Sequence, residues 1–302
     1  MMKKRGFFCF TVFILVMLCP FMTIAQEEMT GEVNWVGGYV SGIGYGTATP
    51  SKNKVIDKLK AIRAAKVVAQ RDLLENIKGV RISSQTTVEN MMLKEDIIKT
   101  RVDGTIKGAQ VFKQHFEWQG NVPLAMVELR VYMTGSAGGT TSKSLVNTLD
   151  LDRKYGTSYY PIPPIPQGTP SPGKPGVSPP ISYDSSKPVT GVVFSLAGQP
   201  FERVLLPAIR TETKSKRKIT IYSVKSVDPK IIRTYGVVRY ADTVEAARKI
   251  TYLGDNIMVV PVVYVSNDNS IFIGTDAARL VKETIRFDND YLQQAKVAIS
   301  SE

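Results

Sequence analysis

The chain is poor in the side chains that most often bind metals or act as nucleophile and base. Among its 302 residues it has one histidine, His115, and two cysteines, Cys9 and Cys19. Both cysteines precede the cleavage site that we predict below, so the exported chain would have no thiol, no disulfide and no cysteine-ligated metal. Multi-histidine metal sites are excluded as well, and a serine triad would have to use His115.

Catalytic motifs are also lacking. His115 lies in an alternating strand pattern, which is typical of a strand-surface or core-edge residue, and no serine motif such as G-x-S-x-G accompanies it. Asp255, Asp268 and Asp276 are close in sequence, but "GDN" and "NDN" around the first two are typical of turns. Neither stretch has the alternating carboxylates and distal glutamate of a calcium loop. We therefore predict that the protein is not an enzyme and has no catalytic residue, no cofactor and no metal site.

The N-terminal segment predicts export. Three basic residues at positions 3–5 precede an apolar run over residues 7–24, which ends in Thr-Ile-Ala at Ala25. This arrangement is typical of a secretory signal peptide cleaved after Ala25. Lipidation at Cys19 is disfavoured because the bulky Leu18 precedes it. No second long apolar run follows, so we expect the protein in the periplasm or at the periphery of the outer membrane.

Positive charge is in excess. Removal of residues 1–25 lowers the formal charge from +12 to +9, which is basic for an exported protein. Anionic envelope components such as lipopolysaccharide, phospholipid head groups or peptidoglycan carboxylates are plausible partners, since surface charge raises encounter rates. The alternative is that the charge only maintains solubility. Export disfavours nucleic acid, and no nucleic-acid-binding motif is present.

A proline-rich stretch divides the chain. "YYPIPPIPQGTPSPGKPGVSPPISYDSSKP" begins at about residue 159 and predicts a semi-rigid spacer, because proline removes backbone donors and favours extended conformations. We predict a signal peptide over 1–25, a first domain over 35–134, a linker over 135–187 and a second domain over 188–301. The two domains are expected to be independent units with their own cores.

The first domain should contain one sheet backed by one long helix. "NWVGGYVSGIGYGTA" predicts a glycine-rich strand, and a helix is expected from about Pro50 to Lys78, ended by Gly79. "TIKGAQVFKQHFEWQGNVPLAMVELRVYM" predicts a β-hairpin that turns at Gln119-Gly120-Asn121. The apolar residues expected to form the buried stripe of the helix are Val55, Leu59, Ile62, Ala65, Ala69, Leu73 and Ile77. The order of strand, helix and strands predicts an α+β fold.

The glycines before this helix do not form a phosphate loop. Thr47 stands where a dinucleotide fingerprint needs its third glycine, and no Gly-Lys-Ser or Gly-Lys-Thr follows. Close backbone packing or strand twist explains them better. We also expect the strand that carries them to pair with a neighbouring copy, because edge strands present unpaired backbone groups. The residues assigned to this self-association strand are Gly42, Gly44 and Gly46.

The helix has a basic face. Lys54, Lys58, Lys60, Arg63, Lys66 and Arg71 outnumber Asp57, Asp72 and Glu75. A solvated helix face is the usual explanation for such charges. The alternative is a surface that contacts anions, and the residues that we assign to this anion-contact face are Lys58, Arg63, Lys66 and Arg71.

The second domain is also expected to be α+β. Short strands are predicted at "PVTGVVFSLAG", "RVLLPAIRTET", "KITIYSVKSVD" and "AKVAIS", and a hairpin at "NIMVVPVVYVSN" and "SIFIGT". "TVEAARKI" and "DAARLVKETI" predict helices.

The first domain resembles a known family. "GIGYGTA", "AIRAAKVVAQRDLLENIKGVRISSQTTVEN", the glycine before "IKGAQV" and "VELRVYM" follow the order of motifs in bacterial envelope proteins related to flagellar assembly protein P and the N-terminal domain of flagellar assembly protein T. The likeness covers about a hundred residues. Many members are lipoproteins, whereas this chain lacks the lipobox. The second domain resembles a module of uncharacterised exported bacterial proteins, in residues that include Leu206-Pro207-Ala208-Ile209 and Gly254-Asp255-Asn256.

The resemblance implies a structural or assembly role. We therefore expect a non-enzymatic exported envelope scaffold that forms homo-oligomers, with a ring or disk of the flagellar basal body as the specific candidate, and with the outer membrane or peptidoglycan as partner. The alternative is a module that binds peptidoglycan or another glycan, because Trp35, Trp118 and the tyrosines could stack on sugar faces.

Overall fold

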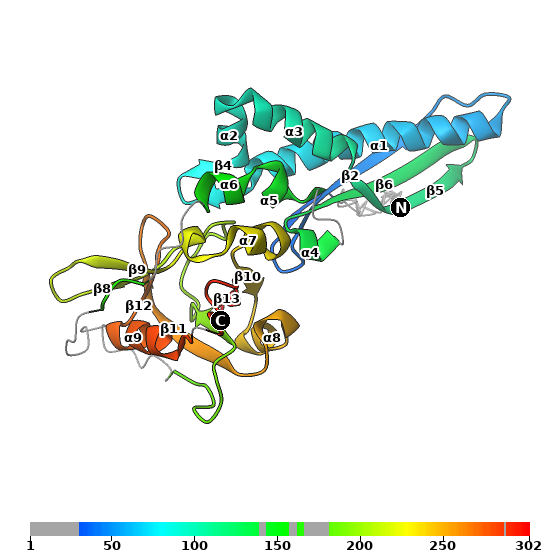
Figure 1. Ribbon diagram of the computed structural model, residues 1–302. Coiled ribbons are helices and arrows are strands. Elements are labelled where there is room, and N and C mark those ends of the chain that lie inside the picture. Colours follow the sequence, from blue (N-terminus) through cyan, green and yellow to red (C-terminus); the bar gives the residue numbers. More distant parts are fainter. Residues whose placement is uncertain (1–29, 139–142, 157–161, 166–180, 287) are drawn as a thin grey trace, which may run out of the picture.

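The protein is built from two α+β units, as predicted. The computed structural model describes residues 30–138, 143–156, 162–165, 181–286 and 288–302, so the predicted signal peptide and most of the proline-rich stretch lie outside the described residues. Figure 1 shows the first unit, with its long helix, above the second, more compact unit. The first unit contains a four-stranded sheet and the second a seven-stranded sheet.

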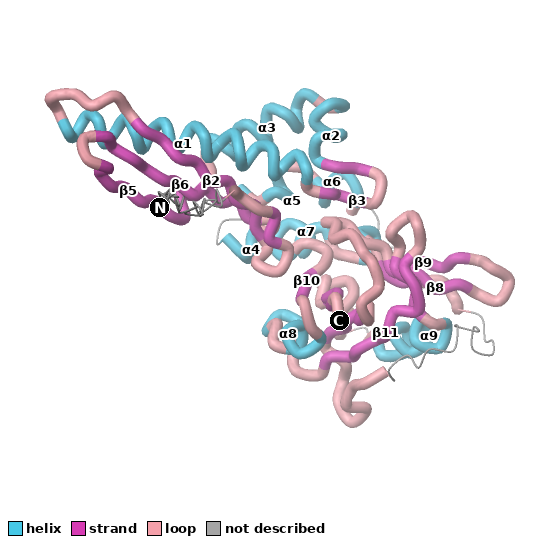
Figure 2. The backbone as a smooth tube through the Cα atoms, turned by 180° about the vertical axis from the view of Figure 1, so that it is seen from behind, coloured by secondary structure: helices cyan, strands magenta, loops and turns pink. Residues whose placement is uncertain are grey.

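The first unit has one helix laid across one face of its sheet. The strands are β1 (Val33–Asn34), β2 (Tyr39–Thr47), β5 (Gln110–Gln119) and β6 (Val122–Tyr132), in the antiparallel order β1-β2-β6-β5. Helix α1 (Lys54–Gly79) crosses β2 and β6 (Figures 1 and 2). The β5–β6 hairpin turns at Gly120, as the sequence predicted, with φ at +61°. The remaining elements are β3 (Arg81–Ser83), β4 (Thr86–Thr87), α2 (Val88–Lys94) and α3 (Asp96–Lys107).

The glycines of β2 bring α1 into backbone contact with the sheet. A Cβ atom built on Gly44 would lie 2.2 Å from the Ala69 nitrogen and 2.3 Å from the Ala65 oxygen. Gly42 and Gly46 meet the helix backbone at similarly short distances, 2.4 Å and 2.2 Å. A strand with side chains at these positions would push the helix away, so glycine is required by the close approach rather than by chain flexibility.

This close approach changes which helix residues are buried. Ala61, Ala65, Ala69, Leu73 and Ile77 have no exposed surface. Val55 and Leu59, which the sequence assigned to the buried stripe, are instead 67% and 61% exposed. Where the helix lies against the β2 glycines there is room mainly for alanine, so Val55 and Leu59 point outward, while Ile62 is half-buried at the side of the contact.

The start of α1 also differs from the prediction. Asn53 caps the helix through its side-chain oxygen, which accepts from the N–H groups of Val55 and Ile56, so Lys54 is the first helical residue and not Pro50. Asp57 is buried one turn later. Its carboxylate accepts hydrogen bonds from the hydroxyl (2.6 Å) and the N–H (2.7 Å) of Ser51. These two bonds lower the pKa of Asp57 from its ordinary value of 3.8, because they favour the charged form.

The second unit has a mixed sheet in the order β10-β13-β7-β11-β12-β8-β9. Strands β10, β13, β7 and β11 run parallel, and β11 with β12 forms the predicted hairpin. The strands are β7 (Gly191–Ser195), β8 (Ile209–Glu212), β9 (Lys218–Tyr222), β10 (Arg239–Ala241), β11 (Ile257–Val265), β12 (Ile271–Ile273) and β13 (Val297–Ser300). The two predicted helices are present as α8 (Val244–Arg248) and α9 (Thr275–Thr284).

One helix of the second unit was not predicted. Helix α7 (Pro229–Tyr235) begins at a capping Asp228, whose carboxylate accepts from the Lys230 N–H at 2.8 Å, and has proline at its first position. Asp228 followed by Pro229 is a helix-start signal, and it indicates α7 in the sequence. Strand β10 follows it and was missed because it is only three residues long.

The segment over 135–156, predicted to belong to the linker, is folded where the structure describes it. It contains α4 (Gly135–Gly138), α5 (Leu145–Thr148) and α6 (Leu151–Tyr155), all of which contact α7 of the second unit. Leu145, Leu149 and Leu151 are completely buried. Helices of four or five residues are too short to show a helical period, which is why the apolar pattern did not reveal them.

The two units are therefore not independent, contrary to the prediction. One cluster of buried apolar residues continues from the first unit into the second. The N–H groups of Leu205 and Leu206 donate to the carbonyl oxygens of Arg81 (3.0 Å) and Ile82 (2.9 Å), which joins the second unit to β3. The buried carboxylate of Asp152 accepts from the Arg233 guanidinium of α7 at 2.5 Å.

We expect Gly44→Ala to lower the free energy of unfolding by about 3 kcal/mol, because the added methyl group overpacks the contact between β2 and α1. Gly104→Ala is the matched control, since a Cβ atom at Gly104 in α3 meets nothing within 4 Å. Alanine there should raise stability by about 0.5–1 kcal/mol through helix propensity. Urea denaturation measures both values, and equal effects of the two substitutions would contradict the packing role of Gly44.

The shared core predicts how the protein behaves when the chain is cut between the units. After insertion of a specific protease site behind Gly173 and complete cleavage, the two fragments should elute together from a size-exclusion column and separate only in denaturant. Two separately eluting, folded fragments in native buffer would restore the interpretation of independent domains.

Candidate functional site

The predicted self-association strand is partly closed by its own helix. Gly42, Gly44 and Gly46 face α1 and pack directly against its backbone. At the edge of β2, the carboxylate of Asp72 accepts from the N–H groups of Gly31 and Ile43, both at 2.8 Å. The three glycines therefore serve to pack the helix. Of the β2 edge, only the end near Thr47 lies beyond the pairing with β1 and the Asp72 contact.

The more accessible edge of this sheet is β5, which the sequence analysis did not single out. It is the outermost strand, and no other described strand pairs with its outer edge. Nine of its ten residues are exposed, and they include the apolar Val111 and Phe112 (55% exposed). A bulge between Val111 and Lys113 interrupts the pairing near its start, after which the register with β6 is regular to Gln119. The signal in the sequence was the polar face formed by Lys113, His115, Glu117 and Gln119, which indicates a strand exposed on that face.

The basic face of α1 divides into two groups. Lys58 places its ammonium group 5.0 Å from the centre of the Phe116 ring, and Lys54 lies 4.3 Å from the Trp118 ring, so these lysines cover the aromatic residues of β5. Arg63 and Arg71 are exposed, and Lys66 is half-buried. None of the four residues assigned to the anion-contact face has a carboxylate within 4.0 Å among the described residues.

The acidic residues of α1 do not neutralise this face. Asp57 is buried against Ser51, and Asp72 is bonded to the backbone of β2. The remaining Glu75 pairs with Lys78 at 2.8 Å, near the end of the helix. The outward surface is therefore more basic than the sequence count of charges indicates.

The candidates for acid–base chemistry lie apart from one another. His115 is exposed on β5, with its imidazole 3.7 Å from the Glu117 carboxylate. Asp268 pairs with Arg210 at 3.4 Å, and Asp276 pairs with Arg279 at 3.3 Å, so both carboxylates have a basic partner. Among the described residues there is no group of three metal-ligating side chains, and no helix there is long and apolar enough to span a membrane.

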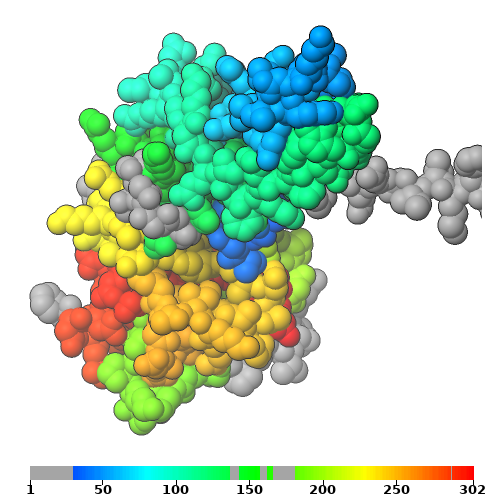
Figure 3. Space-filling view, turned by 90° about the vertical axis from the view of Figure 1, so that its right-hand side faces the viewer, coloured from blue at the N-terminus to red at the C-terminus, as the bar shows by residue number. Residues whose placement is uncertain are grey.

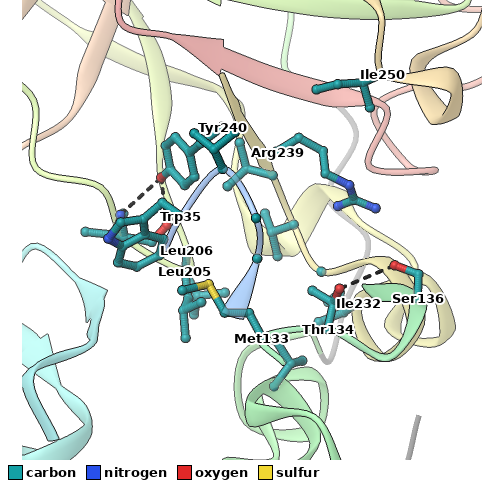
Figure 4. Close-up of a pocket in the computed structure, with 18 residues that line it drawn as sticks. Trp35, Met133, Thr134, Ser136, Leu205, Leu206, Ile232, Arg239, Tyr240 and Ile250 are labelled. Carbon is teal, nitrogen blue, oxygen red and sulfur yellow. Dashed lines mark hydrogen bonds between the residues drawn. The ribbon is translucent and has the colours of Figure 1, made fainter. Parts of the chain in front are cut away.

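A pocket of about 280 Å³ lies at the junction of the two units. The first unit contributes the turn between β1 and β2 and the residues after β6, and the second contributes the loop after β7 and the segment from α7 to β10. In Figure 3 the dark-blue N-terminal segment lies between the upper and lower units, at this junction. The Trp35 ring packs edge-on against Tyr240, with centroids 5.6 Å apart, and the Tyr240 hydroxyl donates to the Val204 carbonyl at 2.7 Å (Figure 4).

The second unit has a recognised relative. Residues 191–301 match the family model of the second domain of Treponema pallidum Tp0624. The match begins at the first residue of β7 and ends just after β13. No curated protein matches the chain.

The exposed arginines of α1 allow a test of the anion-contact face. We expect Arg63→Glu combined with Arg71→Glu to weaken binding to phosphatidylglycerol-containing vesicles at least about tenfold, since each basic residue near an anionic surface contributes about 1 kcal/mol. Wild-type binding should fall steeply with salt, because exposed charges are screened within about 8 Å at physiological ionic strength.

The control reverses the same number of charges elsewhere. Lys230 and Lys249 are exposed on the second unit, and Lys230→Glu with Lys249→Glu should leave vesicle binding within about twofold of wild type. If both double variants lose binding equally, net charge and not the face of α1 attracts the vesicle, and the assignment is wrong.

Proposed function

We propose that the protein is a non-enzymatic scaffold of the bacterial envelope that assembles with copies of itself. The observation that carries this proposal is the outer edge of β5, which no strand of the described residues covers. A long, exposed edge strand is a template for pairing with another chain, and folded proteins usually shorten, charge or cover such edges. Here the regular stretch from Lys113 to Gln119 remains available, and the exposed apolar Val111 and Phe112 lie beside it at the bulge.

The fixed junction between the units supports the same function. A contact repeated from copy to copy closes into a ring only when each copy holds the contact surfaces at the same angle. The shared core, the Leu205 and Leu206 backbone bonds and the contact of Asp152 with Arg233 hold the two units together. The protein is thus a building block of defined shape rather than two units on a free tether.

The sequence indicates the bacterial envelope as the location of the assembly. The predicted signal peptide directs the chain to the envelope, and the basic face of α1 favours an anionic partner such as the outer membrane or peptidoglycan. The resemblance of the first unit to flagellar assembly proteins P and T directs the test to a ring or disk of the flagellar basal body. Cell fractionation of a tagged copy tests the envelope location, and the motility of a deletion strain tests the role in the flagellar basal body.

Glycan binding is the second candidate, and Trp118 is the residue that favours it. Its ring is 37% exposed at the edge of the sheet, where a sugar would compete with the Lys54 ammonium group, 4.3 Å from the ring centre, for the aromatic face. Trp35, by contrast, is packed against Tyr240 in the junction. A glycan-binding function would depend on Trp118 and leave the protein monomeric.

Single cysteines test pairing through β5, because the chain has no cysteine beyond Cys19. In a protein lacking residues 1–25, cysteine is introduced one position at a time at Lys113, Gln114, His115 and Glu117. Paired strands bring opposed Cα atoms within the roughly 4.4–6.8 Å that a disulfide spans. We expect oxidised dimer to peak sharply at one position, with light scattering showing a mass above the monomer.

The control is Lys99→Cys, at an exposed position of α3. Random collision would cross-link all of these variants to a similar extent, without a peak along β5. A monomer at high concentration whose β5 variants form no more dimer than Lys99→Cys would refute the scaffold. A mass of two copies would indicate β5 pairing with itself, and a larger mass a head-to-tail contact with a different edge.

A further inference from the structure

The junction pocket contains a cation that has no acidic partner among the residues that the structure describes. Arg239 is the first residue of β10 and lines the pocket. Its guanidinium donates to the Tyr235 carbonyl oxygen and lies 5.0 Å from the centre of the Tyr252 ring. No carboxylate of the described residues lies within ion-pair distance of it. Two neighbouring arginines differ in this respect, since Arg203 pairs with Asp242 at 2.8 Å and Arg233 with Asp152 at 2.5 Å.

The surroundings of Arg239 make an unpaired charge unfavourable. The side chain is half-buried, and burial lowers the pKa of its guanidinium. Tyrosine rings and one carbonyl oxygen compensate the charge only in part, because a guanidinium carries five N–H donors in a planar fork. A charge taken out of water is stabilised fully by an anion that accepts those hydrogen bonds.

The rest of the pocket is apolar and extends away from this charge. Figure 4 shows Trp35, Leu205, Leu206 and the Tyr240 ring on one side, and the Arg239 guanidinium with the Ser136 hydroxyl on the other. The Thr134 and Ser136 hydroxyls are 3.3 Å apart and add polar groups at that second side. An apolar cavity with a few convergent polar groups is the usual form of a small-molecule site, and 280 Å³ is just below the roughly 300–1,000 Å³ typical of such sites, so it suits a small ligand.

We propose that this pocket binds a small amphipathic carboxylate, whose carboxylate group pairs with Arg239 and whose apolar body lies against Trp35 and Leu206. A planar guanidinium matches a carboxylate with two parallel hydrogen bonds. A single cation also balances a single negative charge, whereas a dianionic phosphate would bring one charge in excess. The ligand would contact both units at once, and would therefore stabilise their junction in proportion to its occupancy.

Octanoate is a suitable probe, with octanol as the neutral molecule of the same chain length. The full mature chain carrying Trp118→Phe has Trp35 as its single tryptophan, so Trp35 fluorescence reports on the pocket and calorimetry gives the affinity. We expect saturable octanoate binding and at least about tenfold weaker octanol binding. Arg239→Gln should weaken octanoate binding at least about tenfold and leave octanol unchanged, because a charge-assisted hydrogen-bonded pair is lost.

Arg203→Gln is the matched control, since this arginine lies 5.8 Å from the Tyr240 ring and already has an acidic partner. It should leave octanoate affinity within about twofold of wild type. Ser136 is exposed at the pocket, so Ser136→Trp should block octanoate without disturbing the core, which keeps the test valid if Arg239→Gln unfolds. Absence of octanoate binding, equal binding of octanol, or equal loss in both arginine variants would overturn the proposal. Assembly through β5 is measured separately and does not depend on this outcome.

Discussion

The backbone contact between α1 and β2 is the constraint on which the first unit depends. Three glycines remove every side chain that would separate strand from helix, and three alanines on the helix complete the match. Helix and sheet gain dispersion contacts between backbone atoms rather than between large side chains. The depth of the contact also decides orientation, since the helix meets the β2 glycines through Ala61, Ala65 and Ala69, while Val55 and Leu59 point away from the sheet.

Two surface properties follow from that orientation. Val55 and Leu59 are exposed. Two acidic residues of the helix, Asp57 and Asp72, accept hydrogen bonds from the segments next to β2 and from β2 itself. Asp57 fixes Ser51 before the helix, and Asp72 closes the edge of β2 through Ile43. The basic residues are left without these acids, and the free edge of the sheet is left on the opposite side, at β5. Packing on one face thus leaves the basic side of α1 exposed, and β5 is the outermost strand of the described sheet.

The junction between the units shows how a partly polar interface is balanced. Asp152 is buried and has Arg233 as partner, which is the condition under which a buried charge is tolerated. Arg239 is placed among tyrosines, so the same interface contains a charge that no carboxylate of the described residues balances. The contrast between these two arginines, both in the segment from α7 to β10, is the basis for assigning a ligand to the pocket.

The sequence by itself determined the fold class, the long helix, the β5–β6 hairpin and most strands of the second unit, because each has a period or a turn residue that acts locally. Tertiary structure decided the rest. Which residues of α1 are buried depends on how close β2 lies to the helix. A periodic pattern of apolar residues counts Val55 and Ala61 alike and cannot tell which of them fits in that contact. The short helices over 135–156 have too few turns to show a period, and their leucines become a core only against α7. The unpaired state of Arg239 depends on which side chains surround it, and residues separated by about two hundred positions, such as Trp35 and Tyr240, meet there only after the two units have packed.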